Sequence, residues 1–71
     1  MLEIGDIVMF DPESKSSYVE YFGGKLAVVI SSTINNSGEN HVRVEWMQPV
    51  KYFDTYTKVS DFGANHFIKS P

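Results

Sequence analysis

The stretch His41-Val42-Arg43-Val44-Glu45-Trp46 alternates strictly between polar and apolar side chains. A period of two places Val42, Val44 and Trp46 on one face of a β-strand and the three polar residues on the other. β-branched and aromatic side chains suit a pleated surface that is half buried. The pattern therefore predicts an antiparallel strand with one face in a core and the other in water, within a small barrel or sandwich.

The chain has 71 residues, so we expect a single domain over residues 1–71. A chain this short buries only about 60% of the surface that its unfolded state exposes, which leaves it marginally stable. It has no cysteine, which excludes disulfides and thiolate metal sites. Its stability must then come from β-branched residues and from one Trp, four Tyr and five Phe, or from a partner.

The charge distribution argues against nucleic-acid partners. Six basic and nine acidic side chains give a net charge of −3, and the basic residues are spread along the chain. Binding to phosphates needs clustered Lys and Arg. No stretch approaches the roughly 20 apolar residues of a membrane helix, and Met1-Leu2-Glu3-Ile4 lacks the features of a signal peptide. We therefore expect a cytoplasmic protein that does not insert into membranes.

Further strands are expected over residues 4–10, 25–32 and 66–69, with a hairpin tip at 35–40 and a tight turn at 60–65. Residues 51–59 are expected to form a fourth strand or a bent loop. Pro49 is expected to interrupt the chain after the central strand. Residues 13–24 form a long connection in which one helical turn is possible, because Tyr18 and Phe22 are four apart. The predicted core comprises Ile7, Leu26, Val28, Ile30, Val42, Val44, Phe62 and Phe67.

Three short motifs carry a resemblance to known folds. They are Gly5-Asp6-Ile7-Val8, then residues 24–29 (Gly-Lys-Leu-Ala-Val-Val), then Val42-Arg43-Val44-Glu45-Trp46. Their order resembles SH3-like small β-barrels of the KOW-like and Tudor-like kinds, and short stand-alone proteins of tailed bacteriophages look similar. The resemblance implies an all-β, five-stranded barrel with a long first loop, encoded by a phage and acting in the host cytoplasm.

A weaker resemblance is to the small SH3-like peripheral subunit of photosystem I. It is carried by Pro12-Glu13-Ser14, the strand over residues 41–46, Tyr52 and Asn65-His66-Phe67, which fall in a similar order. That family tends to be more basic and lacks the Gly23-Gly24 pair. It stands as an alternative, beside a KOW-like nucleic-acid-binding barrel.

Nothing in the sequence indicates catalysis, a metal site or a cofactor. The serines, histidines and aspartates show no spacing that marks a catalytic triad. Asp61-Phe62-Gly63 matches the kinase magnesium motif, but no other kinase motif accompanies it. Glu45 is expected to pair with Arg43 on its own strand face rather than to join His41 and His66 around a metal. We expect a protein that is not an enzyme.

Aromatic residues are the one feature in excess. They fall in the long first loop and just after the main hairpin, two regions that flank a groove in SH3-like barrels. Tyr and Trp bind peptides well because they combine a large rigid ring with a polar tip. Trp46 fits the core and the groove equally well, whereas the tyrosines favour a groove wall. Acidic Asp54 and Glu20 beside these rings favour a partner segment with Lys or Arg. The predicted binding residues are Tyr18, Tyr21, Trp46, Tyr52, Tyr56 and Asp54.

The sequence thus predicts a small binding module that recognises a host or viral protein through this aromatic groove. As a phage protein it would be an accessory part of the particle or a modulator of a host protein.

Overall fold

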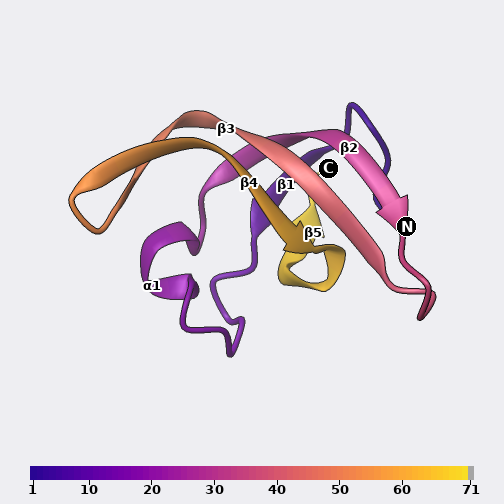
Figure 1. Cartoon of the computed structure of the whole chain (residues 1–71). Helices are drawn as coiled ribbons and strands as arrows, with labels where there is room; N and C mark the ends of the chain where they lie inside the picture. The colour runs from indigo at the N-terminus through magenta and orange to yellow at the C-terminus, as the bar shows by residue number, and fades with distance from the viewer. Residues whose placement is uncertain (71) are drawn as a thin grey trace.

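The computed structural model describes residues 1–70 as one five-stranded antiparallel sheet with little helix (Figure 1). The spatial order of the strands is β4-β3-β2-β1-β5. The elements in chain order are β1 (Ile7–Phe10), α1 (Val19–Phe22), β2 (Leu26–Ile34), β3 (Asn40–Tyr52), β4 (Thr55–Gly63), the 3₁₀ turn η1 (Ala64–His66) and β5 (Phe67–Lys69). The expected all-β class with five strands is confirmed.

The sheet is open rather than closed into a barrel. β5 pairs with β1, and β4 pairs with β3, so these two strands form the edges of the sheet. In Figure 1 the sheet arches over α1 and over the turn that leads into β5. The concave side of the arch therefore holds the core, and the convex side is an outer face that no helix of the described chain covers.

Most predicted strands are present, but β3 is longer than expected. It continues through Pro49 to Tyr52, and its pairing with β4 shifts register between Glu45 and Val50. The irregularity accommodates a proline, which has no N–H to donate to a ladder. Residues 51–59, expected as one strand or a bent loop, are instead the end of β3 and the start of β4, joined by a two-residue turn, Phe53-Asp54.

The core lies on the face that the alternating stretch predicts, with Val42, Val44 and Trp46 at 2%, 0% and 0% exposure. In β2, however, the predicted face is wrong. Ala27 and Val29 are buried, because they pair with Trp46 and Val44. The full buried set is Val8, Phe10, Phe22, Ala27, Val29, Val42, Val44, Trp46, Val50 and Phe67.

Three residues predicted as core lie on the outer face: Ile7, Leu26 and Ile30 are exposed at 39%, 46% and 40%. Val28 shares that face and is half-buried. A shift of one residue moves every side chain of a strand to the opposite face. The predicted inward face of β2 is therefore its outward face in the structure. Of the remaining predicted core, Phe67 is buried and Phe62 is half-buried against the core.

Candidate functional site

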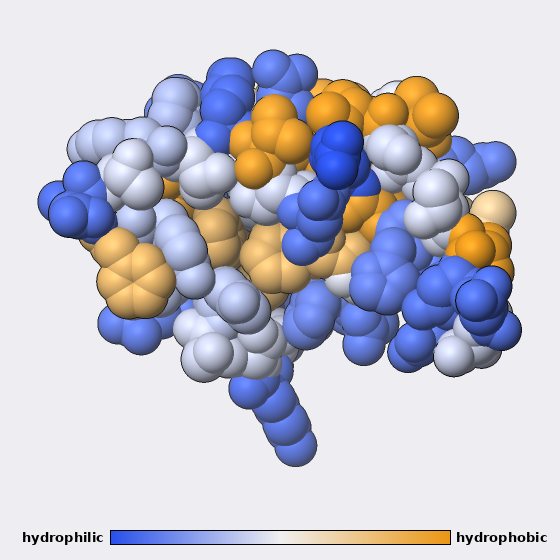
Figure 2. All heavy atoms as spheres, in the orientation of Figure 1, coloured by the Kyte–Doolittle hydropathy of each residue, from blue (hydrophilic) through white to orange (hydrophobic). Residues whose placement is uncertain are grey.

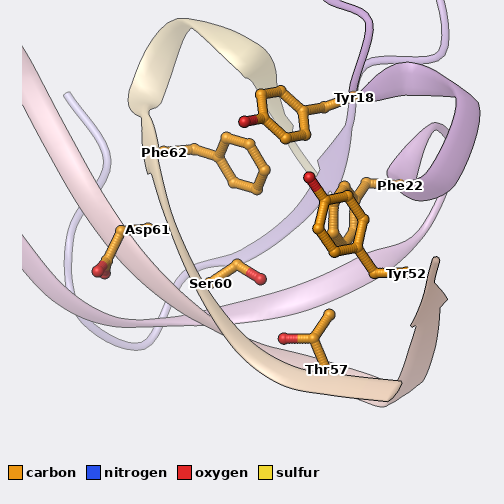
Figure 3. A pocket seen from close by; sticks show the side chains of 7 residues that line it. All are labelled: Tyr18, Phe22, Tyr52, Thr57, Ser60, Asp61 and Phe62. Carbon is orange, nitrogen blue, oxygen red and sulfur yellow. The ribbon is translucent and has the colours of Figure 1, made fainter. Parts of the chain in front are cut away.

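An aromatic groove opens on the concave side between the long first loop and β4 (Figure 3). It has a volume of about 340 Å³. Two rings come from the loop and α1, one from the end of β3, and the remaining side chains from β4. The lining residues are Tyr18, Phe22, Tyr52, Thr57, Ser60, Asp61 and Phe62.

The rings of the groove hold one another in place. Tyr18 stacks on Tyr52 with centroids 6.1 Å apart and meets Phe62 edge-on at 5.3 Å. Phe22 forms the floor, because it is buried and stacks on Tyr52 at 5.6 Å. Aromatic pairs at such separations are favourable beyond the area that they bury. The walls are therefore preformed, while Tyr18 still exposes 41% of its surface.

The loop before α1 is ordered by its own polar side chains. The Asp11 carboxylate accepts a hydrogen bond from the Glu13 N–H, the Ser14 hydroxyl from the Ser16 N–H, and the Ser16 hydroxyl from the Tyr18 N–H. Asp and Ser form such local turns readily. These successive turns position Tyr18 at the groove.

The single turn of α1 then sets Phe22 beside Tyr18. The Phe22 N–H donates to the Tyr18 carbonyl at 3.0 Å, which is the i to i−4 bond of a helix. Gly24 follows with a φ of 79°, in the left-handed region that glycine tolerates. Its N–H donates to the Phe10 carbonyl at 2.8 Å, so the end of α1 is tied to β1.

Trp46 lies beneath the groove and not on its wall. Its indole is fully buried and stacks on Phe22 with centroids 4.8 Å apart. Its Nε1–H donates to the Ser60 hydroxyl at 2.9 Å. The choice that the sequence left open, between core and groove, is decided in favour of the core. Trp46 supports the groove from below.

A second group of rings lies at the β3–β4 turn, next to the groove. Tyr21 meets Tyr52 edge-on at 4.9 Å, and Phe53 contacts both Tyr52 and Tyr21, at 4.6 and 5.4 Å. Phe53 exposes 66% of its surface and has a φ of 58°. A non-glycine residue in this region is strained, and such strain tends to be kept at functional sites. Phe53 was not among the predicted binding residues, because Phe-Asp is not a recognised turn signal.

Besides buried Trp46, the predicted residues Tyr21, Tyr56 and Asp54 do not line the groove. Tyr56 pairs with Lys51 across the β3–β4 ladder, one position from Thr57, which does line it. Successive strand residues point to opposite faces, so Tyr56 projects away from the groove, with 67% of its surface exposed. Its predicted place on the groove wall is wrong. Asp54 is exposed in the turn beside Phe53 and is not part of the lining.

One ion pair borders the groove. The Arg43 guanidinium donates to both Asp61 carboxylate oxygens, from Nε at 2.8 Å and from Nη2 at 3.2 Å. This hydrogen bond raises the pKa of Arg43 and lowers the pKa of Asp61. The expected pairing of Arg43 with Glu45 is therefore wrong, because Asp61 lies directly across the ladder from Arg43.

The surroundings of Tyr52 in the groove also change the pKa of its side chain. Burial raises the pKa of its phenol, and the neighbouring Tyr18 raises that pKa further. A neutral phenol can both donate and accept a hydrogen bond. The groove thus presents apolar ring surface with hydroxyl groups at its rim, which suits binding of a side chain or a short chain segment.

Among residues 1–70, no group of three or more His, Asp or Glu side chains is placed to hold a metal ion. The described part of the chain has no helix that is long and apolar enough to cross a membrane. Comparison of the chain with protein-family models, curated proteins and solved structures found no match.

Proposed function

We propose that this protein is a small non-enzymatic interaction module that binds an extended segment of another protein in the aromatic groove. The observation that carries the proposal is a solvent-open hollow of about 340 Å³ lined by four aromatic rings. Binding pockets in proteins usually begin at about 300 Å³ and combine apolar walls with a few polar groups. This volume fits one or two side chains of a partner rather than a folded domain.

The packing of the aromatic rings also favours a higher affinity for a bound segment. Tyr18 and Tyr52 are held by Phe22 and Phe62, so little side-chain freedom remains to be lost on binding. Binding sites gain affinity when their side chains are already ordered. Aromatic residues are also the side chains that most often carry the energy of protein interfaces. The groove therefore has the composition and the rigidity that peptide recognition requires.

Charge favours a basic partner segment. The chain has a net charge of −3, and exposed Glu20 and Asp54 adjoin Tyr21 and Phe53 beside the groove. Asp61 contributes less, because Arg43 already neutralises it. A Lys or Arg of the partner would face these acids and could lie over an exposed ring, an interaction of roughly 0.5–1 kcal/mol. The resemblance to short phage proteins suggests that the module acts on a host or viral protein in the host cytoplasm.

The test begins with peptides that the immobilised protein selects from a random display library. The tightest peptide is then titrated into the ¹⁵N-labelled protein, and the residues whose signals shift are mapped. Tyr18→Ala and Tyr52→Ala should each weaken the peptide about tenfold or more, the usual effect of removing a central aromatic contact. Tyr56→Ala is the matched control, since it removes an equally large ring from outside the groove, and it should leave the affinity unchanged.

The proposal fails if the selected peptides shift residues away from the groove. It also fails if Tyr52→Ala and Tyr56→Ala weaken binding equally.

A further inference from the structure

Strand β4 forms one edge of the open sheet, and its backbone is unpaired on the side away from β3. It pairs with β3 alone, and among residues 1–70 no backbone group of another segment bonds to it. An exposed edge strand can pair with another chain, so proteins usually keep such edges short or protect them with Pro or Lys. The opposite edge, β5, has three residues, whereas β4 has nine, with no Pro and with Lys58 as its one basic residue. The edge of β4 is therefore the one that a further strand can join.

The hydrogen bonds of β2 show which backbone groups of β4 point outward. The Val29 N–H donates to the Asp6 carbonyl, and the Val29 carbonyl accepts from the Gly5 N–H, so both groups point away from β3. In an antiparallel sheet, successive residues direct their backbone groups to alternate sides. Val44, which lies opposite Val29, therefore directs its groups to β4, where it pairs with Ser60. The residues on either side of Ser60 then direct theirs outward, away from the sheet.

These two neighbours are Val59 and Asp61. The Val59 carbonyl accepts a hydrogen bond from the Thr57 hydroxyl at 3.0 Å, which leaves one of its two lone pairs free. Among residues 1–70, no other backbone group bonds to the outward groups of Val59 or Asp61. Two donors and two acceptors thus lie two residues apart, which is the spacing at which an added strand forms its ladder.

The aromatic groove borders this edge directly. Ser60, Asp61 and Phe62 all line it, although successive strand residues point to opposite faces. In Figure 3 the Ser60 and Phe62 side chains point toward the hollow, whereas the Asp61 side chain points away from it. The Asp61 carboxylate is instead paired with Arg43. Asp61 therefore borders the groove with its backbone, so the unpaired groups and the aromatic walls belong to one surface.

We propose that the partner segment binds as an extended strand that pairs with the outer edge of β4 and lays alternate side chains in the aromatic groove. The inference rests on the proposed function and adds how the segment is held. The occupant follows from the unpaired groups, because a chain with extended backbone meets donors and acceptors at this spacing. A proline-rich segment, which binds aromatic grooves as a polyproline helix, would leave them without partners. Backbone hydrogen bonds thus supply affinity, and the groove supplies specificity.

The same pairing determines where the side chains of the segment lie. Side chains opposite each other in a sheet lie on the same face. The segment residue opposite Ser60 therefore points to the groove side, where Tyr18 and Tyr52 form the walls. Its two neighbours lie opposite Val59 and Asp61, on the outer face. The one opposite Val59, which is 44% exposed, extends the apolar outer face that Figure 2 shows along the top of the molecule. The segment thus carries a large side chain at the groove position, an apolar residue beside it, and no proline among the paired residues.

The test uses the peptide that the immobilised protein selects from a random library. In the free protein, amide hydrogen exchange should be fast at Val59 and Asp61 and slow at Ser60 and Phe62, whose N–H groups face β3. The bound peptide should slow exchange at Val59 and Asp61. Methylating the backbone nitrogens of the peptide one at a time should weaken binding about tenfold at alternate positions and little at the positions between.

Val59→Pro removes one outward N–H from the protein itself. Proline is tolerated at an edge position whose N–H does not serve the ladder, so the variant should fold. It should bind the peptide about tenfold more weakly, as expected for loss of a hydrogen bond. Val59→Ala is the matched control, because it truncates the same side chain but keeps the N–H, and it should leave the affinity unchanged. Circular dichroism confirms folding, and the methylated peptides carry the test if Val59→Pro is unfolded.

The outcomes separate this proposal from the function on which it rests. A peptide that shifts the groove tyrosines but leaves exchange at Val59 and Asp61 unchanged would overturn strand pairing and keep the groove as the binding site. Methylation without an alternating effect, or a folded Val59→Pro variant with the affinity of the parent, would do the same. Peptides that bind away from the groove, or a library that yields no peptide, would overturn both proposals.

Discussion

The role of Trp46 can be tested by removing its ring and then only its hydrogen bond. Trp46→Ala deletes an indole that is fully buried and stacked on Phe22. Loss of a buried Trp or Phe ring costs about 3–5 kcal/mol. A chain of 71 residues has a total unfolding free energy of about 4–11 kcal/mol at the usual value per residue. We therefore expect Trp46→Ala to be partly or wholly unfolded at 25 °C.

Trp46→Phe retains the aromatic stack but removes the hydrogen bond from Nε1 to the Ser60 hydroxyl. The bond itself contributes roughly 0.5–1.5 kcal/mol, and the smaller ring leaves unfilled volume, so the expected loss is about 1–3 kcal/mol. Ser60→Ala removes the acceptor from the same pair. In a double-mutant cycle, the coupling between the two substitutions should be about 1 kcal/mol.

Urea unfolding followed by circular dichroism measures these losses, with Tyr56→Ala as the control. Tyr56 is 67% exposed, so its truncation should change stability by no more than about 0.5 kcal/mol. If Trp46→Ala unfolds within 1 kcal/mol of the parent, the indole is not part of the core. The description of the groove as a surface resting on Trp46 would then be wrong.

Three further results are expected. Phe53→Gly should be more stable than Phe53→Ala by about 1 kcal/mol in urea unfolding, because the φ of 58° strains alanine but not glycine; a less stable glycine variant would contradict the turn geometry. The Tyr52 pKa is raised above 10.0, so its contribution to stability is complete below about pH 10 and lost as pH rises through the folded pKa. Tyr52→Phe should therefore flatten the alkaline unfolding curve. Fluorescence anisotropy should detect no binding to random duplex DNA or RNA at physiological salt, because the basic residues are dispersed.

The sequence predicts the fold class well, because local patterns decide most of it. Strict alternation over His41 to Trp46 assigns the buried face of β3 correctly, and Val42, Val44 and Trp46 are all in the core. β2 lacks such a pattern. Its run of five apolar residues is compatible with either face inward, and only the pairing of Ala27 with Trp46 selects one. That pairing is a tertiary contact, so no pattern within the sequence of β2 can predict it.

Only some of the groove residues could be predicted, again because the others depend on tertiary structure. Tyr18 and Tyr52 line it as expected, since they come from the two regions that flank it. The sequence does not place Tyr56 correctly, because Phe53-Asp54 carries no turn signal and the alternation along β4 depends on where that turn lies. Phe62, which the sequence predicts as core, also lines the groove from its half-buried position.

The two faces of the sheet are formed by alternate residues of the same strands. β3 directs Trp46 and Tyr52 toward the groove side and Glu45 toward the outer face, so the groove needs no residue of the outer face. Substitutions confined to the outer face should therefore leave binding in the aromatic groove unchanged.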